Sequence, residues 1–334
     1  MNLKRSLILC AALALAGSSA SAAEQRTLCV FDPSGANGDA FNFSKDYQSA
    51  AVAWGVELQL KPYTDEKTAV EDFKAGKCDG ALLTGLRSRA FSPFAGTIEA
   101  MGAVQSYGQL KRVIDGLANP KSAKMVTRGE YEVAGIFPAG TVFLFVRDKA
   151  LDAVSKLAGK RVATIDFDPA AKVLVDKVGA SMVAADVGTF SGMFNNGSVD
   201  ACYAPATAYQ PLELGKGLGA KGGIVKFPLG QLTLQVLIRT ARFPAEFGVN
   251  SRKYASKAFG ASLKVVEKAE KAVPAKYWMD VTAEQRQSFD DLLREVRIRL
   301  RDKEKVYDKA MLGLLRRVRC KDDGNRAECA EQKE

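Results

Sequence analysis

The amino-acid sequence predicts an α/β protein built of two similar lobes. Strand-like and helix-like segments alternate along the chain, and this alternation favours parallel strands joined by crossover helices. The order of segments also occurs twice, because FKAGKCDGALLTG at residues 73–85 returns as FNNGSVDACYAPA at residues 194–206. We therefore expect each lobe to hold its own mostly parallel sheet flanked by helices, with the strand tips of the two sheets facing one another across a cleft.

The first lobe is predicted from five segments in the order strand, helix, strand, helix, strand. Short apolar runs predict the strands, and a glycine after each helix-like run predicts where that helix ends. The segments are RTLCVFDP (26–33), DAFNFSKDYQSAAVAW (39–54), VELQLKPY (56–63), DEKTAVEDFKAG (65–76) and CDGALLTG (78–85).

The second lobe is predicted from the same succession of segments later in the chain. Its first strand ends in the same Phe-Asp-Pro as the first strand of lobe 1, and glycines again mark the helix ends. The segments are KRVATIDFDP (160–169), AAKVLVDKVG (170–179), ASMVAAD (180–186), TFSGMFNNG (189–197) and VDACYAPA (199–206).

Two extended segments, residues 133–148 and 222–239, are predicted to cross between the lobes. Pro138 and Gly140 lie in the middle of the first crossing and form the expected hinge, since a few backbone torsions there can close the cleft. The alternative is that both segments are ordinary strands of a sheet. The second crossing would return the chain to the first lobe.

The region beyond Ala241 is predicted to be helical. Apolar residues recur there at helical spacing, which predicts C-terminal helices with one face packed on the lobes. The resulting boundaries are residues 23–138 for the first lobe, 226–280 for its returning part, 139–225 for the second lobe, 281–319 for the C-terminal helices and 320–334 for a polar tail.

Residues 1–22 have the pattern of an export signal. Lys4 and Arg5 precede an apolar run that is followed by small residues up to Ala22, so we expect cleavage there and export of the mature protein. The formal charge of +10 would fit a nucleic-acid partner. Export argues against nucleic acid, and much of the excess charge lies in one C-terminal segment.

The composition excludes several kinds of chemistry. The chain contains no histidine, which removes Ser-His-Asp and Cys-His catalytic arrangements and His-ligated zinc sites. It has no CxxC pair, P-loop or GxGxxG motif, so redox, nucleotide and dinucleotide chemistry have no motif to support them. We expect no cofactor and no metal site.

Five of the six cysteines lie beyond the export signal. Cys320 and Cys329 enclose a polar stretch and are expected to form a disulfide clip on the tail. Cys29 and Cys78 each begin a strand-like run and could pair if those strands are neighbours. Cys202 is then expected to be a small buried residue.

Candidate binding residues are those that follow the strands, because ligands of open α/β sheets bind beyond the carboxyl ends of the strands. Two such sets facing one another would make a polar cleft, although Asp39 precedes a helix and could instead cap it. The candidates are Asp32, Ser34, Asn37, Asp39, Thr84, Arg87 and Arg89 in lobe 1, and Asp166, Asp168, Asn195, Asn196, Pro205 and Tyr209 in lobe 2.

A family resemblance covers most of residues 27–255. It rests on FDPSGANGDAF, YTDEKTAVEDFKAGKCDG, TGLRSRAF, FNNGSVDACYAPATAYQPLELGKGLGAKGGI and FPAEFGVNSRKY. These segments resemble two-lobed periplasmic solute-binding proteins of the kind that serve TRAP dicarboxylate transporters and ABC importers. The resemblance is strongest to a proteobacterial group of solute-binding proteins, some of them labelled as associated with RND efflux.

The resemblance implies a type II-like periplasmic-binding-protein fold and a location in the periplasm. It implies a receptor that passes its solute to an inner-membrane transporter and contacts the membrane only through that transporter. TRAP receptors usually carry an arginine on the strand after GxK, which grips the substrate carboxylate. Here LAGKRVAT places Ala163 at that point and Arg161 two residues earlier, so a monocarboxylate is less favoured.

Three functions compete at this stage. The leading hypothesis is capture of a small polar solute without chemistry. The mixed charges suit a zwitterion, polyol or polycation better than a simple dicarboxylate, and a carboxylate stays among the possible solutes. The second is a periplasmic accessory of an RND-type efflux system, although such adaptors usually need long coiled-coil hairpins. The third is a carboxylate-based hydrolase that would use Asp32 and Asp168.

Overall fold

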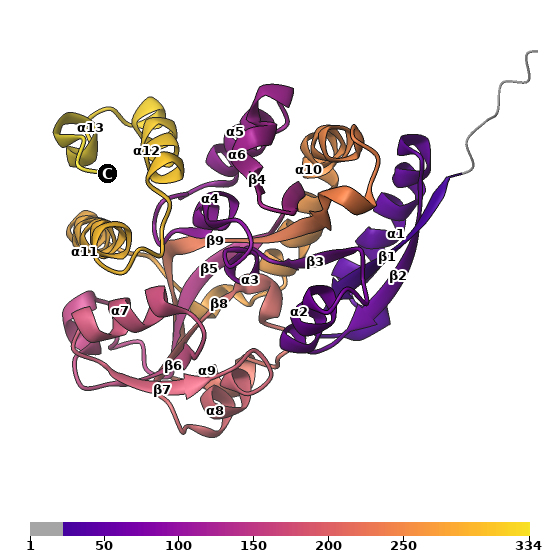
Figure 1. The fold of residues 1–334 in the computed structure, drawn as a ribbon. Coiled ribbons are helices and arrows are strands. Elements are labelled where there is room, and N and C mark those ends of the chain that lie inside the picture. Colours follow the sequence, from indigo (N-terminus) through magenta and orange to yellow (C-terminus); the bar gives the residue numbers. More distant parts are fainter. Residues whose placement is uncertain (1–22) are drawn as a thin grey trace, which may run out of the picture.

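The computed structural model describes residues 23–334, so the predicted export signal lies outside the described residues. Figure 1 shows two α/β lobes joined by long strands. All five segments predicted for lobe 1 form as expected. They are β1 (Glu24–Phe31), α1 (Asp39–Ala51), β2 (Val56–Tyr63), α2 (Glu66–Lys74) and β3 (Gly80–Thr84).

Lobe 2 repeats this arrangement. In lobe 1, β1 pairs in parallel with β2 and β3, and in lobe 2 β6 pairs in parallel with β7 and β8. Gly76 after α2 and Gly197 after α8 have φ of +75° and +84°, a conformation that glycine adopts without steric cost. The lobe 2 elements are β6 (Arg161–Ile165), α7 (Pro169–Lys177), β7 (Ser181–Ala185), α8 (Phe190–Asn196) and β8 (Ala201–Pro205).

The two crossings are long strands that join the lobes into one sheet. β5 (Tyr131–Val146) and β9 (Gly223–Arg239) pair antiparallel along most of their length, and the strand order is β2-β1-β3-β9-β5-β8-β6-β7. The expectation of two separate sheets is therefore wrong, because β9 pairs with β3 at one end and β5 pairs with β8 at the other. Each lobe still has a parallel three-stranded set.

The β5–β9 ladder is irregular where it passes between the lobes. Its register shifts between Val133 and Gly135, between Pro138 and Gly140, and between Val142 and Leu144. Gly140 has φ of +129°, and proline has no N–H to donate to the ladder. Bulges of this kind bend and twist a strand. They explain how two continuous strands serve lobes that face different directions.

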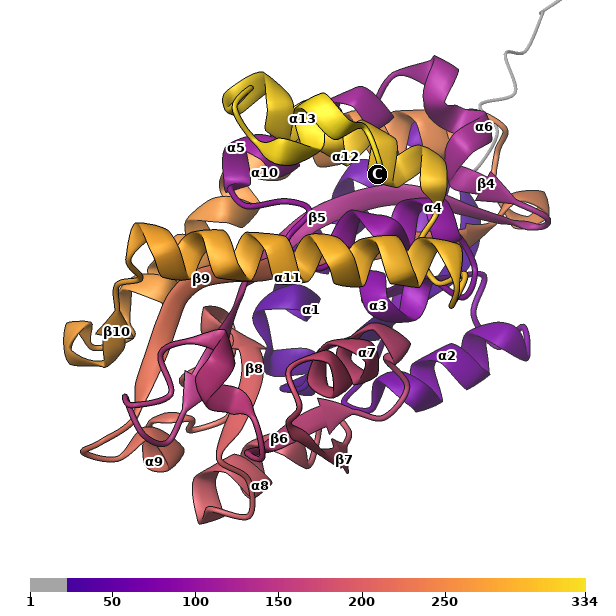
Figure 2. The same ribbon diagram turned by 90° about the vertical axis from the view of Figure 1, so that its left-hand side faces the viewer.

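Long helices cover the sheet and bridge the lobes. Figure 2 shows α11 running across the molecule in front of β5 and β9. It packs against α7 of lobe 2, while α12 packs against α5 on the lobe 1 side, so the predicted packing of C-terminal helices on the lobes is confirmed. These helices are α5 (Tyr107–Leu117), α10 (Phe247–Lys271), α11 (Ala283–Asp302), α12 (Lys309–Asp322) and α13 (Ala327–Glu331).

Short elements connect the larger ones, and side-chain oxygens fix where several helices begin. Thr84 caps α3, Ser92 caps α4, and Thr282 forms a capping box with Gln285 at the start of α11. No helix within residues 23–334 is long and apolar enough to span a bilayer. The short elements are α3 (Gly85–Ser88), α4 (Pro93–Gly96), α6 (Ala123–Val126), β4 (Thr127–Arg128), α9 (Gly215–Leu218) and β10 (Trp278–Met279).

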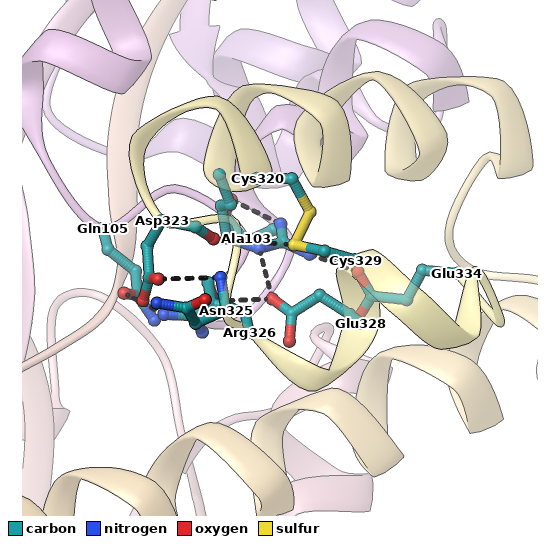
Figure 3. Close-up of a disulfide and its surroundings, with 10 residues drawn as sticks. Ala103, Gln105, Cys320, Asp323, Asn325, Arg326, Glu328, Cys329 and Glu334 are labelled. Atoms are coloured by element: carbon teal, nitrogen blue, oxygen red, sulfur yellow. Dashed lines mark hydrogen bonds and ion pairs between the residues drawn. A yellow bond between two sulfur atoms is a disulfide. The ribbon is translucent and has the colours of Figure 1, made fainter.

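Both expected disulfides are present. Cys29 on β1 is bonded to Cys78 just before β3, and Cys320 on α12 is bonded to Cys329 on α13 (Figure 3). Cys202 is free and buried.

Residues 320–334, predicted to be a polar tail with a disulfide clip, include the end of α12 and the short helix α13. α12 runs on to Asp322, and the Glu334 side chain is buried between Arg297 and Arg319. Two buried guanidinium groups need carboxylate partners, and this segment supplies them.

Candidate functional site

A cavity of about 140 Å³ lies between the lobes. Its walls come from α3 and the segments after it in lobe 1, from β6, α7 and β8 in lobe 2, from β5 and β9 between them, and from α11. The predicted polar cleft is mainly apolar, because aliphatic side chains from both lobes and from the crossing strands turn inward. Examples are Leu86, Val142, Leu144, Val162, Leu174 and Leu229.

One ion pair joins the lobes at this cavity. Nη1 of Arg89, which follows α3, lies 3.4 Å from Oδ1 of Asp168, at the start of α7. The two side chains are 11% and 8% exposed, so the pair is largely shielded from solvent. Asp168 also accepts a hydrogen bond from the backbone N–H of Ala170 (3.1 Å), which fixes its carboxylate as the cap of α7.

A second carboxylate, that of Glu99, lines the same cavity. Its Oε1 accepts hydrogen bonds from the backbone N–H of Thr233 (2.6 Å), the Thr233 hydroxyl (2.7 Å) and the N–H of Gly85 (3.1 Å). Burial raises the pKa of Glu99 to about 7, although the bonds from Thr233 and the charge of Arg89 oppose this rise.

Two tyrosines and a glutamine complete the polar lining. The Tyr203 hydroxyl accepts from the N–H of Ile165 (2.9 Å), and the Tyr307 hydroxyl accepts from the N–H of Met101 (3.2 Å). Burial raises the pKa of Tyr307 to about 12 and also raises that of Tyr203, so both phenols stay protonated at neutral pH. The side chain of Gln231 is held by Thr141 at 3.0 Å.

A second contact between the lobes lies beside the ion pair. The guanidinium carbon of Arg87 on α3 lies 3.2 Å from the centre of the Phe167 ring, which follows β6. A cation over an aromatic face is attractive. Arg87 Nε is also 3.8 Å from Glu66, a buried acid whose pKa burial raises to about 7. Arg87 therefore links the lobes without lining the cavity.

A family model described as "Solute-binding protein AdeT 1/2" matches residues 50–334, which include every residue of the cavity wall named above. The chain belongs to the AdeT 1/2 family of solute-binding proteins. "Probable solute-binding protein AdeT1" of Acinetobacter baumannii is 40% identical over 301 residues, which cover 90% of this chain and 99% of that protein. "Probable solute-binding protein AdeT2" of the same species is 26% identical over 234 residues, which cover 70% of this chain and 98% of that protein.

Solved structures with the same fold are TRAP periplasmic solute-binding proteins. One from Desulfovibrio desulfuricans with bound sn-glycerol-3-phosphate has a TM-score of 0.72 at 13% identity, covering 88% of this chain and 97% of that chain. One from Rhodoferax ferrireducens with bound malonate has a TM-score of 0.70 at 12% identity, covering 90% of this chain and 100% of that chain. These likenesses show the two-lobed fold of the AdeT 1/2 chain.

In this AdeT 1/2 protein, only Arg89 and Asp168 of the candidates taken from the strand ends line the cavity. Asp32 holds the start of α1 instead: its Oδ1 accepts from the N–H of Ser34 (2.8 Å), and its Oδ2 accepts from that of Ala40 (2.9 Å) and of Phe41 (3.1 Å). Asp39, expected as a possible cap, is the exposed first residue of α1.

The loop after β1 is built around the Asp32 carboxylate. Gly38 passes so close to it that an added Cβ would lie 1.9 Å from Oδ1, so only glycine fits there. Ser34 and Asn37 are exposed on this loop, away from the cavity. The polar residues after β1 therefore shape a helix start.

Other candidates also have local roles outside the cavity wall. Thr84 caps α3, and Asp166 is exposed. The Asn195 side chain bonds the backbone of Leu212 (3.1 Å) and Gly217 (3.1 Å). Asn196 accepts from Ser198 (2.9 Å), Pro205 lies beside Gly140, and the ring of Tyr209 packs 6.2 Å from that of Tyr277.

The position of the TRAP arginine is apolar in this AdeT 1/2 protein. Arg161 at the start of β6 pairs with Asp200 (2.8 Å) on the outside of lobe 2, Ala163 is buried, and Val162 lines the cavity. Sequence reasoning missed Glu99, Tyr203, Gln231 and Tyr307. Only Tyr203 carried a signal, because it lies in the strand that repeats the phrase of lobe 1.

Proposed function

We propose that this protein is a non-catalytic periplasmic receptor that captures one small solute between its lobes and delivers it to an inner-membrane transporter. The observation that carries this proposal is the cavity whose walls come from both lobes, with Arg89 and Asp168 joined across it. A solute that contacts both walls binds the closed form better than the open form, and so favours closure. The transporter would then recognise the closed form.

The hinge in this proposal lies in β5 and β9. Both strands cross between the lobes, and the register shift from Pro138 to Gly140 places an irregular backbone beside the cavity residue Val142. Small torsional changes there would move lobe 2 relative to lobe 1 while the ladder on either side stays paired. The solved neighbours of this fold hold small molecules such as malonate and sn-glycerol-3-phosphate, which supports a small solute here.

The test is solute retention by protein purified from its own periplasm. Native mass spectrometry is expected to show a bound small molecule on the wild type and on Met182→Trp, which adds bulk at an exposed site on β7. Leu174→Trp fills the cavity from α7 and is expected to lose that molecule while it still folds. Equal retention by Leu174→Trp and the wild type, or no retained solute in any sample, would contradict the proposal.

A further inference from the structure

The cavity wall carries one more negative than positive group. Among the described residues that line it, Arg89 is the only cation, and Asp168 and Glu99 are the two carboxylates. Asp168 is the ion-pair partner of Arg89. All three hydrogen bonds to Glu99 reach Oε1, and Oε2 has no hydrogen-bond partner within residues 23–334. One carboxylate oxygen at the wall is therefore free to contact a bound molecule.

The excess of negative charge at the cavity wall favours a positively charged solute. The wall of the cavity is mainly apolar, so charge interactions there are stronger than at the open surface. A cation would compensate Glu99 and leave the pair of Arg89 and Asp168 intact. An anion would add a third negative group and would have to compete with Asp168 for Arg89, which breaks the contact that joins the lobes.

The uncharged residues of the cavity wall indicate that the solute has an apolar body. Aliphatic side chains such as Val142, Leu174 and Leu229 offer no hydrogen bonds, so a sugar or polyol would lose its water without compensation. The volume of about 140 Å³ is close to the roughly 150 Å³ of an apolar protein cavity that takes up benzene. Phe289 and Tyr307 add aromatic surface to the wall, which attracts both rings and cations.

We infer that the solute is an organic monocation with an apolar body about the size of one aromatic ring, its ammonium group bound against the free oxygen of Glu99. This inference rests on the proposed receptor function. It differs from the small anionic molecules bound in the solved neighbours, because Arg161 on β6 pairs with Asp200 outside the cavity and Val162 lines the cavity on this strand.

Binding of such a cation should depend on pH. Glu99 faces Arg89 after α3, Glu66 on α2 and Thr233 on β9, and its pKa in the free protein is about 7. A bound ammonium group favours the ionised carboxylate, so affinity rises as pH rises through 7 and falls below it. For one group with this pKa, affinity should be about tenfold higher at pH 8 than at pH 6.

The test uses four probes of matched or contrasting charge: benzylamine, benzyl alcohol, benzoate and succinate. Titration calorimetry on the full mature chain is expected to show the tightest binding for benzylamine and none for succinate. Glu99→Gln should lower the affinity for benzylamine at least about tenfold at pH 8 and remove its pH dependence. Glu57→Gln is the control, because it changes an exposed acid on β2 that does not line the cavity, and it should keep both the affinity for benzylamine and its pH dependence.

The outcomes separate this inference from the receptor function. Tighter binding of benzoate or succinate than of benzylamine, or unchanged benzylamine binding in Glu99→Gln, overturns the inference of a cation and leaves the receptor proposal standing. Failure of all four probes also overturns it. The receptor proposal fails independently, when no solute is retained from the periplasm or when Leu174→Trp retains it equally well.

Discussion

Charge is buried in two regions of this molecule, and the two regions treat it differently. Glu328 and Glu334 lie beside the Cys320–Cys329 disulfide (Figure 3). Arg319 pairs with Glu328 (3.0 Å) and with Glu334, and Glu334 also pairs with Arg297 (2.5 Å). At the cavity, Glu99 lines the wall with no cation of its own. In the first region each of these buried charges has a partner of opposite sign. At the cavity, all three hydrogen bonds to Glu99 reach Oε1, so its Oε2 is a free acceptor among the described residues.

The contrast separates structural charges from candidate binding charges. In the C-terminal cluster, guanidinium N–H groups also donate to the carbonyls of Met101 (2.9 Å) and Ala103 (2.7 Å), so the buried charges tie α11 and α12 to lobe 1. Burial acts to raise the pKa of Glu328, but the pairs with Arg326 and Arg319 outweigh burial and lower this pKa to about 2. A fully matched cluster stabilises a fold, and an unmatched acid on a cavity is available to a ligand.

The largest expected effect comes from unbalancing the matched cluster. Arg319→Ala leaves Glu328 and Glu334 buried with fewer partners, and loss of one member of a buried pair costs about 3–5 kcal/mol of unfolding free energy. Urea unfolding at pH 7 measures this loss. Arg317→Ala, on the exposed face of α12, is the control and should change stability by less than about 0.5 kcal/mol. Similar losses in both variants would contradict a structural role for the cluster.

A smaller effect is expected from neutralising the unmatched acid. The pKa of Glu99 is about 7 in the folded protein, above its ordinary value of 4.5, so the folded state holds this proton more tightly than the unfolded state. Its contribution to stability is therefore present below pH 4.5 and is lost as pH rises to 7. Glu99→Gln should equal the wild type near pH 4.5 and exceed it by about 2–3 kcal/mol at pH 8.

Urea unfolding at several pH values checks this prediction. Glu57→Gln, which changes an exposed acid on β2, is the control and should follow the wild type at every pH. A difference between Glu99→Gln and the wild type that stays constant from pH 4.5 to pH 8 would show that the acid does not titrate in this range.

The smallest expected change in stability concerns the ion pair between the lobes. Asp168→Asn keeps an oxygen that can cap α7 but removes the negative charge that holds Arg89 through one 3.4 Å contact, so unfolding free energy should fall by about 1–2 kcal/mol. The unliganded lobes should spend more time apart, which small-angle scattering detects as a larger radius of gyration. Asp168→Ala should lose about 1 kcal/mol more, because it removes the cap as well. An unchanged radius in Asp168→Asn would show that the pair does not hold the lobes together.

Local patterns were sufficient to predict the elements of both lobes. Gly76 and Gly197 end α2 and α8 through their own backbone conformation, and the apolar strands are short enough to recognise from composition. The union of the strands into one sheet could not be predicted this way. It depends on the pairing of β5 with β9, whose partners are far apart in the sequence and whose register shifts three times.

The site was harder to predict because its residues come from different kinds of segment. Arg89 and Asp168 follow strands, so the rule about strand ends found them, but the same rule selected Asp32, whose oxygens bind backbone N–H groups of its own loop. Glu99 ends the short 3-10 helix Thr97–Glu99 after α4, and Tyr307 lies between α11 and α12. Only the folded chain brings such positions to one cavity.

The placement of the covalent cross-links has a further consequence. Cys29–Cys78 lies within lobe 1 and Cys320–Cys329 joins helices packed on that side, whereas β8 of lobe 2 carries the free thiol of Cys202. Folding in a reducing environment would therefore lower the stability of lobe 1 and leave that of lobe 2 unchanged. Protein made in a reducing cytosol should accordingly have a lobe 2 of normal stability and a less stable lobe 1.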